Sequence, residues 1–211
     1  MRPDPYLASE DSAPLRRELQ PYAGKACLEI RAGNGGNLVA LAKSFKIAVG
    51  TDVERPGMTD WSTAGGDFVL CDRASCFRNG TFDLVAFNPP YLRSDGIDDR
   101  AIDGGKEGQV PLAFMREALR VVKDSGRILM LLTDGNHVDR FEEECRQRGF
   151  ELVRSAGKHM FYEELSVYEA RRAAGVPPGG YVATGDREIE WRPGAPLRIL
   201  GKVMRPGYSQ R

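Results

Sequence analysis

The 211-residue sequence lacks several features that would assign it to a compartment or to a class of ligand. It contains four cysteines, none in a CxxC pair, and two histidines far from them, which argues against a zinc site and a disulfide framework. No stretch approaches the roughly 18 apolar residues of a membrane span, and the N-terminal residues contain no apolar run of signal-peptide type. These absences predict a cytoplasmic protein with reduced thiols, no metal site and no membrane anchor.

The total charge names no partner either, because 30 Lys+Arg balance 30 Asp+Glu and the formal net charge is zero. A neutral chain has no long-range attraction for nucleic acid or anionic membranes, so any such binding depends on a local patch. The contents of 41% hydrophobic and 28% charged residues are close to the globular average. We therefore expect one globular domain followed by a tail.

Composition divides the chain near residue 173. Residues 173–211 contain 7 Gly and 5 Pro among 39 residues, and 6 basic against 3 acidic residues give this segment a net charge of +3. Stretches at 188–192 and 197–204 predict two paired strands around a proline-glycine turn. We predict a domain over 1–172 and a C-terminal extension over 173–211 that forms a β-hairpin or is partly disordered.

Within residues 1–172, short apolar stretches alternate with amphipathic stretches of helical period. Strands are predicted at Ala26–Ile30, Ile47–Thr51, Phe68–Cys71, Leu84–Phe87 and Arg127–Leu132. Helices are predicted at Asp11–Leu19, Asn37–Phe45, Pro111–Val122 and Val138–Arg148. The alternation is typical of a doubly wound, Rossmann-like α/β sheet. Its seven strands include an antiparallel hairpin of Glu151–Ser155 and Glu164–Ala170 at the edge, and a loop is expected over 54–66.

A glycine-rich turn follows the first predicted strand. Residues 29–36, Glu-Ile-Arg-Ala-Gly-Asn-Gly-Gly, lead from a strand to a helix, where glycines tolerate positive φ and let a ligand approach the backbone. Asp52 ends the next strand, where a carboxylate can accept both ribose hydroxyls of a nucleoside. Arg31 replaces the first glycine of a dinucleotide motif, and no Walker loop is present, which excludes ATP hydrolysis. The pattern fits a nucleoside site or a plain structural turn.

A second motif, Asn88-Pro89-Pro90-Tyr91, follows a buried strand directly. The two prolines remove two backbone donors and fix φ, which predicts a rigid turn with unpaired carbonyl groups at the carboxyl end of a central strand. The Asn88 side-chain carbonyl and the Pro89 backbone carbonyl can accept the two hydrogens of a planar amide or aromatic amine. Tyr91 can stack on that planar group. The motif therefore predicts a site that aims a nitrogen lone pair at an electrophile.

Together these motifs resemble the class I S-adenosylmethionine (SAM)-dependent methyltransferases of the HemK/PrmC-like group. The sequence is most similar to the short archaeal and eukaryotic form, which methylates the glutamine of the Gly-Gly-Gln motif in class I release factors. The resemblance covers about residues 6–172 and includes three further motifs, at 6–12 (Tyr-Leu-Ala-Ser-Glu-Asp-Ser), 104–108 and 164–168. Arg31 and Ala8 depart from the family pattern, which has glycine and proline there.

The resemblance implies a set of functional residues and partners. Cofactor binding is implied for Ser12, Glu29, Arg31, Gly33, Gly35, Asp52, Asp72 and Arg73. Within that set Ser12 lies near the methionine part of the cofactor, Asp52 holds the ribose and Asp72 accepts the adenine amine. Catalysis is implied for Asn88, Pro89, Pro90 and Tyr91, with S-adenosylhomocysteine as product and no dedicated base. A release factor is the implied substrate, with a small zinc-binding activator protein as the implied partner near the third strand, because the N-terminal helical domain of the bacterial enzymes is not seen.

Two other functions stay open on the sequence. The exocyclic amine of adenine in RNA or DNA offers the same donors, although only the basic tail could contact phosphates. A non-catalytic binding protein would result if Arg31 intruded on the cofactor, whereas a salt bridge from Arg31 to the cofactor carboxylate would preserve the site.

Overall fold

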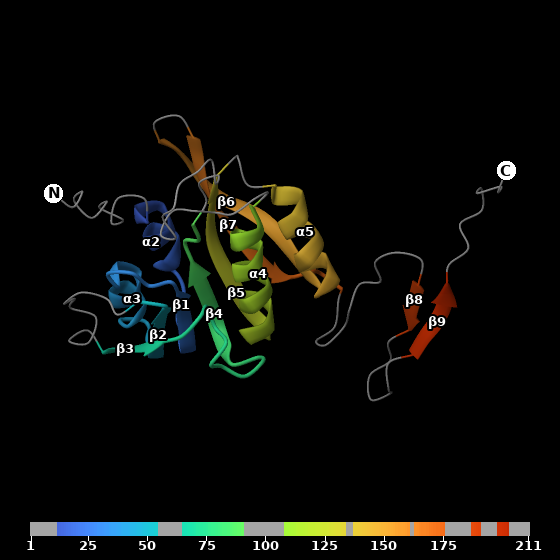
Figure 1. The fold of residues 1–211 in the computed structure, drawn as a ribbon, viewed down its shortest axis with the longest axis horizontal. Helices are drawn as coiled ribbons and strands as arrows, with labels where there is room; N and C mark the ends of the chain where they lie inside the picture. The colour runs from blue at the N-terminus through green and yellow to red at the C-terminus, as the bar shows by residue number, and fades with distance from the viewer. Residues whose placement is uncertain are drawn as a thin grey trace.

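The computed structural model describes residues 12–54, 65–90, 108–133, 137–160, 163–175, 187–190 and 198–202. Its centre is a seven-stranded sheet in the order β3-β2-β1-β4-β5-β7-β6 (Figure 1). The strands are β1 (Gly24–Ile30), β2 (Phe45–Asp52), β3 (Gly66–Leu70), β4 (Phe82–Phe87), β5 (Val122–Thr133), β6 (Phe150–Met160) and β7 (Glu163–Arg172). The predicted sheet of seven strands is confirmed.

The direction of the strands follows the predicted division into a parallel part and an antiparallel hairpin. Strands β1 to β5 pair in parallel, whereas β7 is antiparallel to both β5 and β6. The later strand of the hairpin lies inside the sheet and β6 forms the edge. The chain order reverses at β1, which has β2 on one side and β4 on the other, and this is the point where doubly wound sheets bind ligands.

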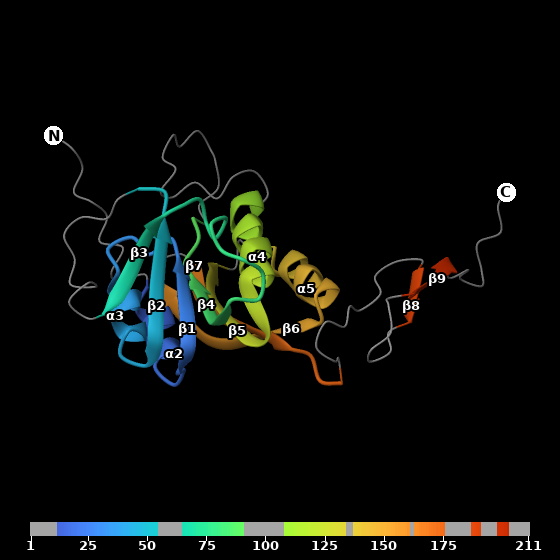
Figure 2. The same cartoon turned by 90° about the horizontal axis from the view of Figure 1, so that it is seen from below.

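Two helices cover each face of the sheet (Figures 1 and 2). Helices α4 (Gln109–Val121) and α5 (Val138–Gln147) contribute to one core, and α2 (Ala13–Leu19) and α3 (Gly36–Leu41) contribute to the other. The prediction for α3 was too long, because the helix ends at Leu41. Phe45 begins β2 instead, and its side chain is buried in the second core.

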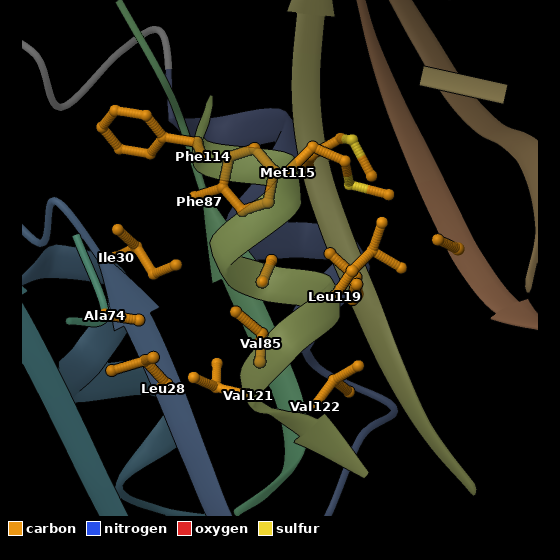
Figure 3. Close-up of a cluster of buried hydrophobic side chains, with 14 of the residues drawn as sticks. Leu28, Ile30, Ala74, Val85, Phe87, Phe114, Met115, Leu119, Val121 and Val122 are labelled. Carbon is orange, nitrogen blue, oxygen red and sulfur yellow. The ribbon is translucent and has the colours of Figure 1, made fainter. Parts of the chain in front are cut away.

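Strand β4 is anchored on both sides of the sheet. Val85 and Phe87 lie in the core beneath α4 (Figure 3). Leu84 and Ala86 lie in the other core, to which α2 and α3 contribute. Alternate residues of a strand point to opposite faces, so a strand covered on both faces is apolar at every one of these positions. Burial of each large side chain contributes about 1.5–3 kcal/mol. The residues that follow Phe87 therefore leave the sheet from a fixed position.

Two C-terminal strands, β8 (Arg187–Glu190) and β9 (Arg198–Lys202), form a separate antiparallel pair. The pair overlaps the strands predicted at 188–192 and 197–204, with β8 beginning one residue earlier. The domain boundary near residue 173 and the nature of the extension stay predictions. The loop predicted over 54–66 lies mostly outside the described residues.

The four cysteines carry free thiols. Within the described ranges, no helix has the length and hydrophobicity needed to cross a membrane.

Candidate active site

The described candidate residues gather where β1, β2, β3 and β4 end. Glu29 is the next-to-last residue of β1 and Asp52 ends β2, while the remaining candidates follow the strand ends or precede α2. Parallel strands that are neighbours in a sheet place their carboxyl ends at the same edge. The topology thus brings together Ser12, Glu29, Arg31, Gly33, Gly35, Asp52, Asp72, Arg73, Asn88, Pro89 and Pro90 at one edge of the sheet. Tyr91 lies outside the described residues.

The glycine turn after β1 is held by Asp52 at the end of β2. Gly33 and Gly35 have φ values of 52° and 77°, in the left-handed region that glycine adopts readily. The Gly33 N–H donates to Asp52 Oδ2 at 3.0 Å, and Asp52 Oδ1 accepts from the Val53 N–H at 2.8 Å. The Glu54 N–H is a third, longer donor, at 3.4 Å from Oδ1. Because a carboxylate has about four acceptor positions, Asp52 keeps acceptor capacity for a ribose hydroxyl. Among the described residues nothing lies within 4 Å of where a Cβ at Gly33 would be.

Glu29 is buried beneath the glycine turn and belongs to a polar chain that sequence reasoning missed. Asn37 Nδ2 donates to Glu29 Oε1 at 2.9 Å, and Arg16 Nε donates to Asn37 Oδ1 at 3.2 Å. Burial raises the pKa of Glu29 to about 8, against the smaller lowering effects of these partners. Glu29 Oε2 is buried and has no donor among the described residues. The only sequence signal for Asn37 is a polar residue in the first turn of the helix that follows the glycines.

Arg31 contacts the proline turn after β4, and its two arrangements toward a cofactor stay predictions. Its φ of 60° is left-handed, a conformation that costs a non-glycine residue roughly 1–2 kcal/mol. Arg31 Nη1 donates to the backbone carbonyl of Asn88 at 3.2 Å. This contact corrects the prediction of unpaired carbonyl groups for Asn88, and for the Pro89 carbonyl it stays a prediction. The arginine thus joins the glycine turn after β1 to the proline turn after β4.

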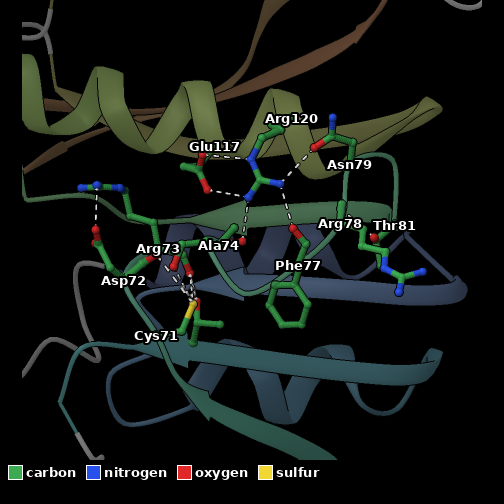
Figure 4. A network of polar contacts seen from close by, with 12 residues as sticks. Cys71, Asp72, Arg73, Ala74, Phe77, Arg78, Asn79, Thr81, Glu117 and Arg120 are labelled. Carbon is green, nitrogen blue, oxygen red and sulfur yellow. Dashed lines mark hydrogen bonds and ion pairs between the residues drawn. The ribbon is translucent and has the colours of Figure 1, made fainter.

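The segment after β3 carries Asp72 and Arg73. Asp72 is exposed and forms an ion pair with Arg73 at 2.8 Å, and Arg73 has a left-handed φ of 52°. The Arg73 carbonyl accepts from the buried Thr51 hydroxyl at 2.7 Å, which attaches the segment to β2. Farther along, Arg120 of α4 donates to carbonyl groups of the same segment (Figure 4). The backbone that would flank an adenine is thus fixed from two sides.

Asn88 is held by its side chain as well as by its carbonyl group. Its Nδ2 donates to Ser12 Oγ at 3.2 Å, so this hydroxyl does not cap α2, although the Ser12 carbonyl begins the helix. Asn88 Oδ1 is buried and has no donor among the residues that the structure describes. An unsatisfied buried acceptor costs about 1–3 kcal/mol, which is characteristic of a position that meets a ligand. Pro89 and Pro90 are buried beside it.

Comparison with known proteins places this arrangement among methyltransferases. No family model matches the sequence. The chain is 29% identical over 185 residues to a Methanocaldococcus jannaschii protein named, provisionally, as a protein N5-glutamine methyltransferase, covering 82% of this chain and 94% of that protein. It is 25% identical over 150 residues to the release factor glutamine methyltransferase of Agrobacterium fabrum, covering 61% of this chain and 50% of that enzyme.

Solved structures share the fold. The E. cuniculi Mtq2–Trm112 complex, described as responsible for methylation of the eRF1 translation termination factor, matches with a TM-score of 0.63 and 23% identity over 78% of this chain and 96% of that one. A Streptococcus mutans protein in complex with S-adenosylhomocysteine matches with a TM-score of 0.53 and 14% identity, covering 75% of this chain and 96% of that one. The Rossmann-like methyltransferase fold is thereby established.

Fold, site and relatives together define the class of this protein: it is a methyltransferase. The resemblance found in the sequence is confirmed, since the relatives at 29% and 25% identity are both named as glutamine methyltransferases.

Proposed function

We propose that this enzyme transfers a methyl group from SAM to the side-chain amide nitrogen of a glutamine. The observation that carries the proposal is the buried Asn88 Oδ1, which lacks a donor in the described part of the chain while Nδ2 of the same amide is engaged by Ser12. This oxygen lies directly after β4, at the edge where the nucleoside-binding candidates also gather. An amide N–H of the substrate would satisfy it.

The rest of the proline turn suits the same substrate. An amide nitrogen is a poor nucleophile because its lone pair is delocalised, so both of its hydrogens must be held to aim that lone pair. Asn88 Oδ1 accepts one hydrogen in this proposal and the Pro89 carbonyl accepts the other, while Tyr91 stacks on the amide plane. When bound, SAM supplies a methyl group that is already activated by its sulfonium. The enzyme therefore needs no dedicated base, and the proton leaves to water or a carbonyl after transfer.

The residues present fit such a cofactor. The open backbone at Gly33 and the remaining acceptor positions of Asp52 suit a ribose, and the exposed carboxylate of Asp72 suits an adenine amine. Glu29 Oε2 is a further unsatisfied acceptor beneath the glycine turn, and Ser12 is proposed to lie near the methionine part. The neighbour solved with S-adenosylhomocysteine supports the same cofactor class.

We further propose a class I release factor as the substrate and a small activator protein as the partner. The names of the Agrobacterium relative and of the E. cuniculi complex support both. Among the strands that the structure describes, β3 is the last on its side of the sheet and pairs with β2. Ile47, Val53 and Leu70 on or beside these two strands are 53%, 66% and 58% exposed. Such apolar side chains at a sheet edge are suited to a protein partner, which in the family the chain resembles is a zinc-binding protein.

Calorimetric titration with SAM and S-adenosylhomocysteine tests the cofactor, with Asp52→Ala as the variant that should lose binding. Mass spectrometry of a release factor incubated with SAM and the enzyme, alone or co-expressed with an activator, tests the substrate. Methylation of the Gly-Gly-Gln glutamine, absent when that glutamine is replaced by glutamate, is expected. Methylation of adenine in RNA or DNA by a chain that leaves the glutamine unmodified would instead establish the nucleic-acid function.

A further inference from the structure

Arg31 and Asn88 occupy equivalent positions at the ends of neighbouring strands. Strands β1 and β4 pair in parallel, and the last partners of their register are Ile30 and Phe87. Arg31 and Asn88 are therefore the first residues beyond the paired region, 57 residues apart in sequence. The 3.2 Å hydrogen bond from Arg31 Nη1 to the Asn88 carbonyl connects the two segments just beyond the ends of β1 and β4.

The two prolines fix φ at positions 89 and 90, but they limit the hydrogen bonds that the turn can make. Pro89 and Pro90 have no N–H, so these two positions supply no backbone donor to the turn. The orientation of the Asn88 carbonyl sets the plane of the peptide that leads into Pro89, because the peptide unit is planar. The guanidinium of Arg31 supplies a donor from outside the turn, and its hydrogen bond to the Asn88 carbonyl further fixes that plane.

The backbone of Arg31 adopts a conformation that disfavours a residue with a side chain. Its φ of 60° favours glycine, which is the residue that the family pattern has at this position. Glycine would relieve the backbone and remove the contact with Asn88. Arg31 thus has its backbone in the glycine turn, which is proposed to bind the cofactor, and its guanidinium on the proline turn, which is proposed to bind the substrate. It therefore constrains the distance between the two turns.

We propose that Arg31 is a positioning residue for methyl transfer: it holds the Asn88 peptide while Ser12 holds the Asn88 side chain, leaving Oδ1 aimed at the substrate amide. The inference rests on the proposed function for its effect on turnover. Small displacements of reacting groups lower rates steeply, whereas cofactor affinity depends on other groups, chiefly Asp52. Replacing Arg31 is therefore expected to lower kcat and to leave the affinity for the cofactor unchanged.

The test compares wild type, Arg31→Gly and Arg31→Lys, with Arg116→Ala as the control for loss of a surface arginine in α4. In Arg31→Gly we expect kcat for glutamine methylation to fall at least about tenfold, with the Kd for S-adenosylhomocysteine and the KM for SAM within about twofold of wild type. Arg31→Lys keeps a cationic donor and should recover part of kcat. Arg116→Ala should match wild type. An unchanged kcat, or weaker cofactor binding in place of a lower kcat, would overturn the positioning role.

A second readout separates this inference from the proposed function. Selective ¹⁵N-asparagine labelling gives one pair of side-chain amide signals for each asparagine, and Asn88→Ala assigns the pair from Asn88. Arg31→Gly should shift or broaden that pair, Arg31→Lys should restore it, and the pair from Asn79 should stay unchanged. An inactive wild type would contradict the proposed function, and the spectra would still decide the positioning role. An unshifted Asn88 signal in Arg31→Gly would overturn it.

Discussion

Two segments that leave the parallel sheet at strand ends are each held by an arginine from another element. Arg120 of α4 holds the segment after β3, donating to the carbonyl oxygens of Ala74 and Phe77 at 2.8 Å each (Figure 4). Arg31 donates to the carbonyl oxygen of Asn88 in the turn after β4. Both contacts give a side-chain donor to carbonyl groups that lie outside the strands.

What differs is how each arginine is itself held. Glu117, one turn earlier on α4, accepts from Arg120 Nε at 3.0 Å and from Nη2 at 2.7 Å, so a residue of the same helix orients the guanidinium. Arg31 instead stands on a turn with a left-handed φ. We therefore expect the Arg120 cluster to stabilise the fold, whereas the left-handed φ of Arg31 costs backbone energy and its contact with Asn88 is the one proposed to set the geometry of the site.

The largest expected effect is a difference in kcat between variants of Asn88, in the turn after β4, and of Asn79, in the segment after β3. Asn88→Ala removes the acceptor proposed for the substrate amide and should lower methyl transfer about 10²–10³-fold in kcat. Asn79→Ala removes a side chain that accepts from Arg120 Nη1 at 3.1 Å and should leave kcat unchanged. Steady-state kinetics on both variants make the comparison. Equal activity of Asn88→Ala and wild type would contradict the role of the proline turn.

Next in size is the loss of the Arg120 cluster. Arg120→Ala leaves the Ala74 and Phe77 carbonyls and the Glu117 carboxylate without this donor, and should lower the free energy of unfolding by about 2–4 kcal/mol. The control on the same helix is Arg116→Ala, whose exposed ion pair with Glu144 is worth about 1 kcal/mol or less. Urea denaturation measures both. A loss for Arg120→Ala no larger than that of the control would show that the cluster is not stabilising.

A smaller effect concerns pH. Because burial raises the pKa of Glu29 from 4.5 in its ordinary state to about 8, the folded chain binds this proton more tightly than the unfolded chain. The contribution to stability is therefore complete below the unfolded pKa and is lost as pH rises through about 8. The two pKa values place the decline in unfolding free energy between roughly pH 5 and 8. Glu29→Gln carries no titrating proton, so in this variant the decline should be flatter.

The control for this pH effect is Glu54→Gln, a change of the same kind at an exposed position. It should keep the wild-type dependence of the unfolding free energy on pH. If Glu29→Gln kept the same slope as Glu54→Gln, the buried carboxyl would not be the source of the dependence.

The smallest expected effect tests whether a left-handed φ is strained at these arginines. Arg73→Gly and Arg73→Ala both remove the exposed ion pair with Asp72, but only glycine relieves the φ of 52°. The glycine variant should therefore be about 1 kcal/mol more stable than the alanine variant in urea denaturation. Equal stability of the two variants would remove the argument that a positive φ is strained at these arginines.

Much of the fold and part of the site could be predicted from local patterns. The apolar strands, the amphipathic helices and the two turns follow from side-chain period and from the backbone limits of glycine and proline. That Asp52 lies beside the glycine turn also follows, because consecutive parallel strands end at the same edge. The end of α3 did not follow, since Phe45 suits a helix or a strand equally and is drawn into β2 by burial in the core.

The contacts that distinguish this site were beyond local patterns. The hydrogen bond between Arg31 and Asn88, the chain from Arg16 through Asn37 to Glu29, and the hold of Arg120 on its segment join residues 8 to 57 positions apart. Backbone period decides which face of an element is buried, and that information is present in any short stretch of sequence. Partnerships between polar side chains depend on the register of β1 against β4 and on the way helices cover the sheet, which exist only once the chain has packed.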